Sequence, residues 1–261
     1  MRSGGAVFGL GGLVLGVAVV AWAHVSMGGD LRVFVQAEAL AVVFGGTAAA
    51  LCVSFPGAAL HAALWRVIDL FTRRSASLEA LVPAFMGYAR KAKREGLMKI
   101  EHEIAGAGDD FLARALMLSV SGLSVEVVRE ALDIDARVGA ERDEEAAQVF
   151  EAAAGYAPTL GIVGAVLGLM RVMQHFSASA GIGSGIAAAF VATIYGVGAA
   201  NLIFLPLATR LRARARRDAL RRELVIDGVL ALRDGSTPSV VEERLAGYVH
   251  KGRNAGLAEV A

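Results

Sequence analysis

Hydrophobic residues gather in four long runs along the chain, and most charged residues lie in the stretches between them. The runs extend approximately from Gly4 to Val25, from Ala39 to Phe55, from Ala152 to Met173 and from Ile186 to Ala208. Each is close to the roughly 20 helical residues that cross about 30 Å of hydrocarbon. The pattern therefore predicts four transmembrane helices, named here the first to fourth predicted spans.

The first predicted span begins where a cleavable signal peptide would also lie. One basic residue, Arg2, precedes it, and the second predicted span follows directly. Its apolar run, at about 20 residues, is also longer than the core of a signal peptide. These features favour a retained transmembrane helix, with cleavage as the alternative.

The polar stretches have helical character. The segment from His61 to Glu151 is rich in Ala, Leu, Glu, Arg and Lys, and its apolar residues recur every three or four positions. A similar pattern follows the fourth predicted span until Gly235 and Pro238 interrupt it. We predict an all-α membrane protein with a mainly helical cytoplasmic domain. The expected division is 1–60 (first and second spans), 61–151 (cytoplasmic loop domain), 152–208 (third and fourth spans) and 209–261 (cytoplasmic tail).

The positions of Lys and Arg predict the orientation of these helices. Of the 26 basic residues, twelve lie from Arg66 to Arg142 and eleven from Arg210 to Arg253. The short connecting loops, 26–38 and 175–185, contain only Arg32. Because basic residues concentrate on the cytoplasmic side, both termini and the long loop are expected in the cytoplasm.

Composition agrees with a chain that lies partly in lipid and gives no sign of an enzyme. Hydrophobic residues make up 56% and charged residues 20% of the sequence, and the net charge of +1 does not indicate a nucleic-acid partner. The single cysteine, Cys52, lies in an apolar run and cannot form an intrachain disulfide. We found no Cys/His cluster for a metal, no nucleotide-binding glycine loop and no catalytic triad, so no cofactor is expected.

The interiors of the predicted spans contain no Asp or Glu, and Arg171 lies at the outward end of the third, where its side chain can reach the interface. Chains that move ions through a membrane usually need a carboxylate or a comparable polar group at depth. If this protein conducts ions, another chain must supply the acid.

Small residues dominate the third and fourth predicted spans. Gly161, Gly164 and Gly168 recur at three- and four-residue spacing, which allows close helix approach. Such a surface serves packing within one subunit, or it lines a central space in which a partner helix sits. The lone hydroxyl of Thr193 has two interpretations: a bond back to the carbonyl of Ala189, which composition alone favours, or a place in an ion path.

Two further features allow a structural and a functional interpretation. Pro158 and Pro206 lie near the expected cytoplasmic ends of their spans, where a proline can bend the helix or have no mechanical role. The cytoplasmic loop carries a dense set of charges, which forms either a solvated helix face with spaced charge pairs or an electrostatic docking surface. Its members are Arg90, Lys91, Lys93, Arg94, Glu95, Glu101 and Glu103. The basic run from Arg210 to Arg222 is interpreted as a topology anchor.

The order and wording of five segments resemble the MotA/PomA family of flagellar stator subunits along nearly the whole chain. One of them alone would be weak, but all five occur in order. The segments are ALAVVFGGTAAAL, AKREGLMKIE, AAAGYAPTLGIVGAVLGLM, GIAAAFVATIYGVGAAN and VIDGVLALRDGSTPSVVEERL.

The resemblance implies a function that agrees with the missing carboxylate. In this family, five A subunits surround two copies of a MotB/PomB-like single-span subunit, whose helix carries the ion-binding Asp, in the bacterial inner membrane. Ion flow turns the ring, and the cytoplasmic loop of the A subunit pushes the FliG ring of the rotor.

The resemblance also implies roles for charged loop residues. Lys93 stands where the family motif has its loop Arg, and Glu101 falls on the terminal Glu of that motif, so this pair is expected to face the rotor. Lys93 lacks the planar guanidinium fork, which a bidentate contact needs. Arg94, which stands at the family's Lys position, or Arg90 is expected to supply the guanidinium that Lys93 lacks.

In the spans, Pro158 and Pro206 match family prolines linked to coupling between ion passage and loop movement. Thr193 matches a Thr near the ion path. Ala165 stands where Na⁺-driven members commonly have Thr, and the missing oxygen favours H⁺ over Na⁺ as the coupling ion.

Two rival interpretations remain. ExbB/TolQ-like subunits also form five-membered rings, but they have three spans and lack the KREGLMKIE and DGVLALRDG motifs. A transporter or membrane enzyme would be expected to show intramembrane acids or interrupted helices.

Overall fold

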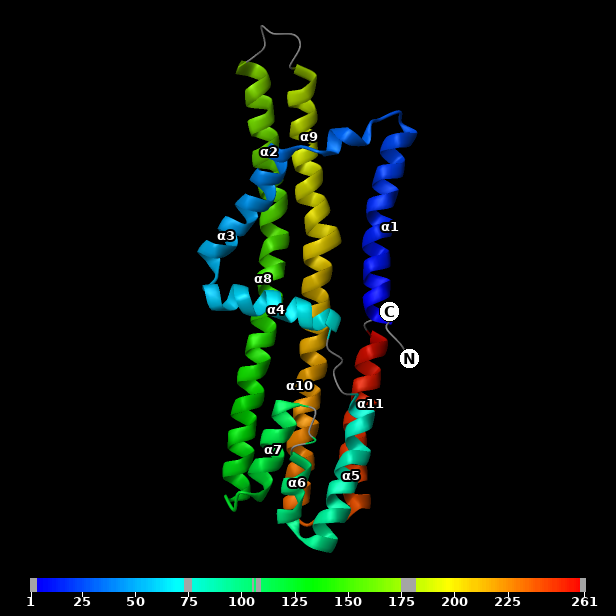
Figure 1. Ribbon diagram of the computed structural model, residues 1–261, viewed down its shortest axis with the longest axis vertical. Coiled ribbons are helices and arrows are strands. Elements are labelled where there is room, and N and C mark those ends of the chain that lie inside the picture. The colour runs from blue at the N-terminus through cyan, green and yellow to red at the C-terminus, as the bar shows by residue number, and fades with distance from the viewer. Residues whose placement is uncertain (1–3, 73–76, 105, 107–108, 175–181, 259–261) are drawn as a thin grey trace. The chain divides into compact units, whose positions relative to one another are not determined.

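The computed structural model describes residues 4–72, 77–104, 106, 109–174 and 182–258. Every regular element within these residues is helical, which confirms the predicted all-α class (Figure 1). Most of the expected outward loop 175–185 lies outside the described residues. In chain order the elements are α1 (Gly4–Ser26), η1 (Leu31–Phe34), α2 (Ala37–Leu40), η2 (Ala41–Gly45), α3 (Gly46–Ser54), α4 (Gly57–Thr72), α5 (Leu78–Glu95), η3 (Leu97–Ile100), α6 (Glu101–Ile104), α7 (Asp110–Val120), α8 (Val125–Gln174), α9 (Ile182–Ala199), η5 (Ala200–Phe204), α10 (Leu205–Arg233) and α11 (Pro238–Ala258).

Apolar helices suited to a membrane occur in the regions that the sequence predicted. By length and composition, Leu31–Ser54, Val125–Gln174 and Gly185–Arg233 can each cross a bilayer. Gly11–Ser26 is a shorter apolar helix among the residues searched, so the first predicted span, and with it the count of four, remains a prediction. The protein is an all-α membrane protein.

The chain forms two compact units, and each is described by itself. The first unit contains residues 1–72 and 145–211, and the second contains 73–144 and 212–261. The long helices α8 and α10 contribute residues to both units.

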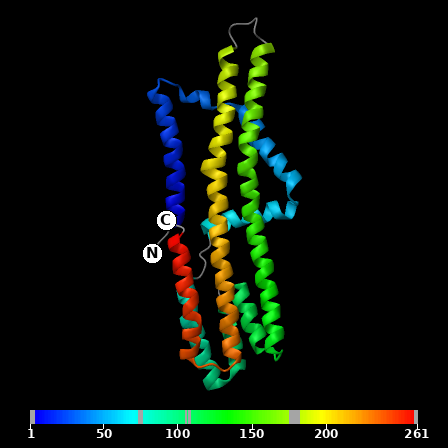
Figure 2. The ribbon, with the colours of Figure 1, turned by 180° about the vertical axis from the view of Figure 1, so that it is seen from behind.

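In the first unit, glycines let α8 and α9 pack closely. The part of α8 from Glu145 onward runs beside α9 in Figure 1, and the view from behind in Figure 2 agrees. A Cβ added to Gly161 would lie 2.9 Å from the carbonyl oxygen of Ala192, and one added to Gly164 would lie 2.8 Å from the Ala192 Cβ. At Gly168 the nearest atoms, in Ala189, would be 3.0 Å away. The glycine surface of the third span therefore serves packing within one subunit.

The second predicted span consists of α2, the π-helical η2 and α3, and its GGT motif has a packing role. Thr47 is buried, and its hydroxyl donates to the carbonyl of Val43 at 2.6 Å. A Cβ on Gly46 would lie 3.0 Å from a methyl group of Leu160 on α8. The motif therefore brings this helix against α8.

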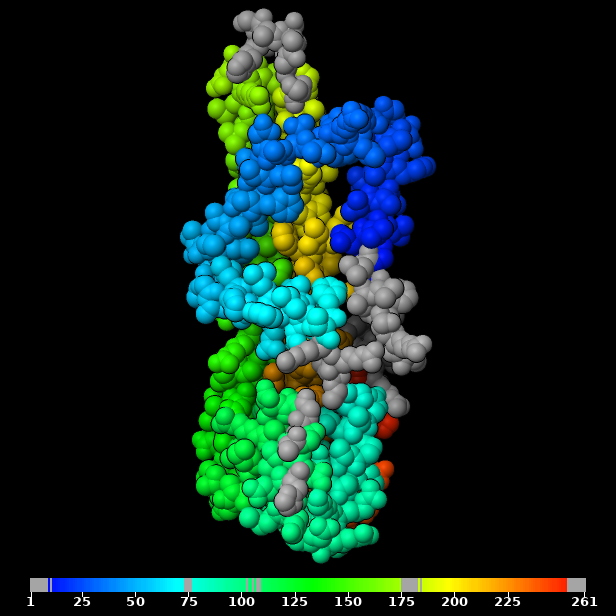
Figure 3. Space-filling model, viewed as in Figure 1, coloured from blue at the N-terminus to red at the C-terminus, as the bar shows by residue number. Residues whose placement is uncertain are grey.

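Helix α4 crosses α8 within the first unit, and its side chains form a band across the face shown in Figure 3. Ala63 on α4 packs with Ala146 and Val149 on α8. Large apolar side chains on other faces of α4 remain exposed, including Leu64, Trp65 and Ile68. The helix is therefore apolar on more than its packed side.

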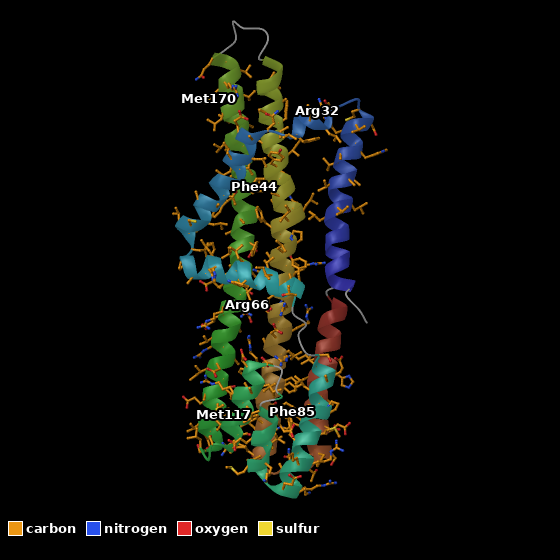
Figure 4. All side chains as sticks on the ribbon, viewed as in Figure 1. Arg32, Phe44, Arg66, Phe85, Met117 and Met170 are labelled. Carbon is orange, nitrogen blue, oxygen red and sulfur yellow. The ribbon has the colours of Figure 1, made fainter. Side chains whose placement is uncertain are left out.

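The second unit has the larger core. Phe85 on α5 (labelled in Figure 4) is fully buried among helices α5, α7, α8, α10 and α11. Helix α10 ends at Arg233, and Gly235, two residues further on, has a φ of +69°. The backbone N–H of Ser236 donates to Ala231 and that of Gly235 to Leu232, the pattern of a Schellman cap.

Candidate functional site

The charged loop residues lie where α5 ends and α6 begins. Helix α5 stops at Gly96, whose φ of +90° is unfavourable for residues with a Cβ. The η3 turn that follows is anchored by Ile100, which is fully buried. The glycine and the apolar positions of AKREGLMKIE thus shape the turn and leave its charges to the surface.

Lys91 differs from the other basic residues of this loop. Its ammonium donates to Glu103 at 2.6 Å and joins α5 to α6. This hydrogen bond raises the pKa of Lys91. Burial raises the pKa of Tyr88, and the negative charge of Glu103 adds to that shift. Lys91 and Glu103 therefore form a structural pair, although the sequence did not separate them from their charged neighbours.

The residues predicted to face the rotor, Arg90, Lys93, Arg94 and Glu101, are all exposed. Within the part of the chain that the structure describes, Lys93 and Glu101 form no ion pair with each other or with another side chain. Arg90 donates at 3.4 Å to the carbonyl of Met86 on its own helix. Each of these charges can therefore meet a group on another molecule.

Lys93 also lines a cavity of about 220 Å³, whose lining contains Arg233 and no acidic side chain among the described residues. The Arg233 guanidinium donates to the carbonyls of Leu123 and Ser124. Two cations therefore face one opening, and Coulomb's law favours an acidic group there.

The predicted ion-path residues lie in the first unit. A Cβ on Gly196 of α9 would lie 2.5 Å from the carbonyl oxygen of Ala157 and 3.1 Å from the Cα of Pro158, so the α8 proline lies in a close helix contact. Ala165 and Thr193 are half-buried. Thr193 Oγ1 donates to the Ala189 carbonyl at 3.4 Å, which is one of the two alternatives considered for this hydroxyl.

Pro206 has different surroundings from Pro158. It is the second residue of α10, directly after the π-helical turn η5, and it is exposed. A proline donates no backbone hydrogen bond, and π-helical turns often occur where a helix departs from regular geometry. Two departures from regular α-helix therefore adjoin each other at this point.

Other charged contacts were not expected from the sequence. Arg171 lies 3.8 Å from Glu38, which directly precedes the predicted second span. Opposite charges at matching span ends were the signal that could have suggested this pair.

The interpretation of the basic run from Arg210 to Arg222 as a topology anchor is incomplete. In the second unit, several of its arginines form ion pairs with acids that lie far away in the sequence. These pairs are Arg212 with Glu144 at 3.0 Å, Arg221 with Asp109 at 2.5 Å and Arg222 with Asp143 at 3.0 Å. The run therefore also holds the second unit together.

Comparison with known proteins gives consistent matches. Residues 103–224 match the model of the MotA/TolQ/ExbB proton channel family. Motility protein A of Bacillus subtilis is 31% identical over 240 residues, which cover 91% of this chain and 88% of that protein. Chemotaxis protein PomA of Vibrio alginolyticus is also 31% identical, over 94% of this chain and 95% of that protein.

Solved structures agree with these sequence matches. The flagellar MotAB stator complex from Bacillus subtilis contains a chain with a TM-score of 0.83 and 31% identity, over 92% of this chain and 94% of that one. The C. jejuni MotAB structure gives a TM-score of 0.85 at 24% identity, over 93% and 95% of the two chains, and supports the fold. The chain belongs to the MotA/TolQ/ExbB proton channel family, among its motility protein A and PomA members.

Proposed function

We propose that this chain is the ring-forming A subunit of an ion-driven flagellar stator in the bacterial inner membrane. The observation that carries the proposal is similarity along nearly the whole chain to named motility proteins and to a chain of a MotAB stator complex. The same similarity disfavours an ExbB- or TolQ-like energiser. We further propose a homopentamer that surrounds two copies of a MotB-like single-span subunit, with both termini in the cytoplasm.

The proposed division of labour assigns the ion-binding acid to the partner. No Asp or Glu lies inside the predicted spans of this chain, whereas ion passage usually needs such a group at depth. The Thr193 hydroxyl donates to Ala189 but keeps acceptor lone pairs, so it can still contact an ion or its water. Ala165 offers no side-chain oxygen, which supports H⁺ as the coupling ion.

Torque transfer is proposed to use the exposed charges at the end of α5 and the start of α6. Each elementary charge that crosses 100 mV releases about 2.3 kcal/mol, which is available to move the ring against the partner. Lys93, Arg94 and Arg90 would then meet acidic groups of FliG, and Glu101 would meet a basic one. The Lys91–Glu103 pair holds α5 and α6 together next to these exposed charges.

Conduction and swimming test the proposal at different levels. Expressed alone, the chain should pass no ion current. With its single-span partner, after removal of any plug segment, it should conduct, and an Asp→Asn change in the partner helix should abolish the current. Conduction by the isolated chain would overturn the two-subunit mechanism, and strict Na⁺ dependence would overturn the proton assignment.

The rotor contact has its own test. Lys93→Glu should impair swimming at high load while the complex still assembles, and an opposite change in FliG should partly restore it. Lys251→Glu, which reverses an exposed lysine on α11, is the matched control and should swim normally. Normal torque from Lys93→Glu would remove this residue from the contact.

A further inference from the structure

The first unit contains a cavity of about 500 Å³ between α1, α4, η5 and the start of α10. Its walls are largely apolar and include Leu13, Phe71 and Ile203. The one charged side chain among its described lining residues is Arg210. The cavity is therefore an apolar space with a single cation in its wall.

The absence of a side chain at Gly9 leaves room for the Arg210 guanidinium. A Cβ at Gly9 would lie 2.1 Å from Nη1 and 2.4 Å from Cζ of Arg210, so the guanidinium lies directly against the α1 backbone. Arg210 is half-buried, and it forms no hydrogen bond or ion pair with any residue that the structure describes. A partly desolvated cation without a partner costs free energy, and an anion beside it would offset that cost.

The surroundings of the cavity indicate the depth at which it lies. Arg210 is the first basic residue after the apolar run of the fourth span. Helix α4, which supplies Phe71 and Val67 to the cavity, also exposes Trp65. A basic residue at the end of an apolar run and an exposed tryptophan nearby in the same cavity-forming unit are typical of the membrane–water interface, where lipid headgroups meet acyl chains.

We infer that this cavity binds an anionic phospholipid, with its phosphate at Arg210 and acyl chain along Leu13, Phe71 and Ile203. An anionic lipid supplies both the charge and the apolar surface that the cavity lacks, and the cytoplasmic leaflet is rich in such lipids. A free phosphate would leave the apolar walls unfilled, and an apolar helix would leave the guanidinium unpaired. The inference depends on the membrane location of the chain and not on its role in a stator.

Two variants test the charge of Arg210 and the volume of the cavity separately. Arg210→Gln removes the cation, and Arg216→Gln, which changes an exposed arginine elsewhere on α10, is its control. Gly12 and Gly11 both have open space where a Cβ would be, but of the two only Gly12 lines the cavity. Gly12→Leu therefore fills the cavity, and Gly11→Leu is its neighbouring control.

The test is native mass spectrometry of the full-length protein, purified with its partner subunit and exchanged into mixed micelles that contain phosphatidylglycerol or phosphatidylcholine. The wild-type protein should retain phosphatidylglycerol in preference to phosphatidylcholine. Arg210→Gln should weaken phosphatidylglycerol retention about tenfold or more, since a charge-assisted contact is lost, and Gly12→Leu should reduce retention of both lipids. Both control variants should behave like the wild type.

Four results would overturn the inference. Arg210→Gln could retain as much phosphatidylglycerol as the wild type, or the wild type could retain both lipids equally. Inorganic phosphate could also displace the bound lipid signal at millimolar concentration, which would identify a phosphate site without a lipid requirement. Loss of oligomer mass in Gly12→Leu with unchanged lipid retention would assign the cavity to another protein chain instead.

Discussion

Replacement of Gly228 by alanine should destabilise the second unit, although alanine is the better helix former. A Cβ at this position on α10 would lie 2.7 Å from Cδ1 and Cε1 and 2.8 Å from Cζ of Phe85. Carbon atoms in favourable contact are about 3.5–4.0 Å apart, so the ring or α10 must move. Phe85 is fully buried in the core of the second unit, which leaves the ring little room to withdraw.

Two opposing effects set the magnitude. Gly→Ala inside a helix gains about 1 kcal/mol in helix propensity. Overpacking a tight core costs about 1–3 kcal/mol, and the short distances to a rigid ring place Gly228→Ala toward the upper end of that range. We expect a net loss of about 1–2 kcal/mol, which corresponds to a roughly 5- to 30-fold change in the opening equilibrium.

Hydrogen exchange of the intact protein measures this change locally. Amides of α5 and α10 near the contact should lose protection by about 5- to 30-fold, whereas those of α9 should be unchanged. Gly247→Ala on α11 is the control, because a Cβ there meets nothing within 4 Å, and it should stabilise its helix slightly. Adding Phe85→Leu to Gly228→Ala should cost less than the sum of the single changes. Unchanged or increased protection in Gly228→Ala would refute the packing argument.

Three further predictions use other parts of the chain. Gly161→Leu should separate α8 from α9 and lower the heat resistance of the purified complex, whereas Gly155→Leu, which meets open space, should not; equal losses would contradict the packing role. Burial and a hydrogen bond to a carboxylate raise the pKa of Tyr248. The contribution of the protonated hydroxyl to the free energy of unfolding is therefore complete below about pH 10 and is lost as the pH rises through the folded pKa. Thermal unfolding should show a steeper alkaline decline in the wild type than in Tyr248→Phe. Arg222→Met should destabilise the protein in chemical denaturation, by at most about 3–5 kcal/mol, because it removes one partner of the buried Asp143, and the double change Arg222→Met with Asp143→Leu should recover much of the loss.

The location of the helices could be predicted well from hydropathy, because a membrane span needs a long apolar run. The predicted second span, Ala39–Phe55, lies close to the α2–η2–α3 stretch, which extends from Ala37 to Ser54. The π-helical turn within that stretch was not predicted, since its hydrogen-bond pattern leaves no clear mark on composition. Hydropathy also did not predict α4 as a helix in the same unit as the spans.

The roles of individual residues were harder to predict, because they depend on which helix faces meet. Lys91 and Lys93 are two positions apart and chemically identical, yet Lys91 pairs with Glu103 and Lys93 is exposed. Gly228 could not be assigned a role from the sequence, since its neighbour Phe85 lies on a helix far away in the chain. Spacing along one helix identifies a face, but only the fold identifies what that face contacts.

The glycine packing between α8 and α9 has a consequence for the proposed ring. Since Gly161 and Gly168 are covered by α9 of the same chain, they are not available as a surface for a partner helix. Large apolar side chains elsewhere on these helices remain exposed, including Ile162 on α8 and Phe190 on α9, with 59% and 67% of their surfaces accessible. In a membrane such residues can face lipid without cost, so close contacts with other chains would have to come from shape and small side chains rather than from the hydrophobic effect. Half-buried Ala165, a small residue beside the glycine surface on α8, is therefore better suited to approach by a second helix than the glycines are.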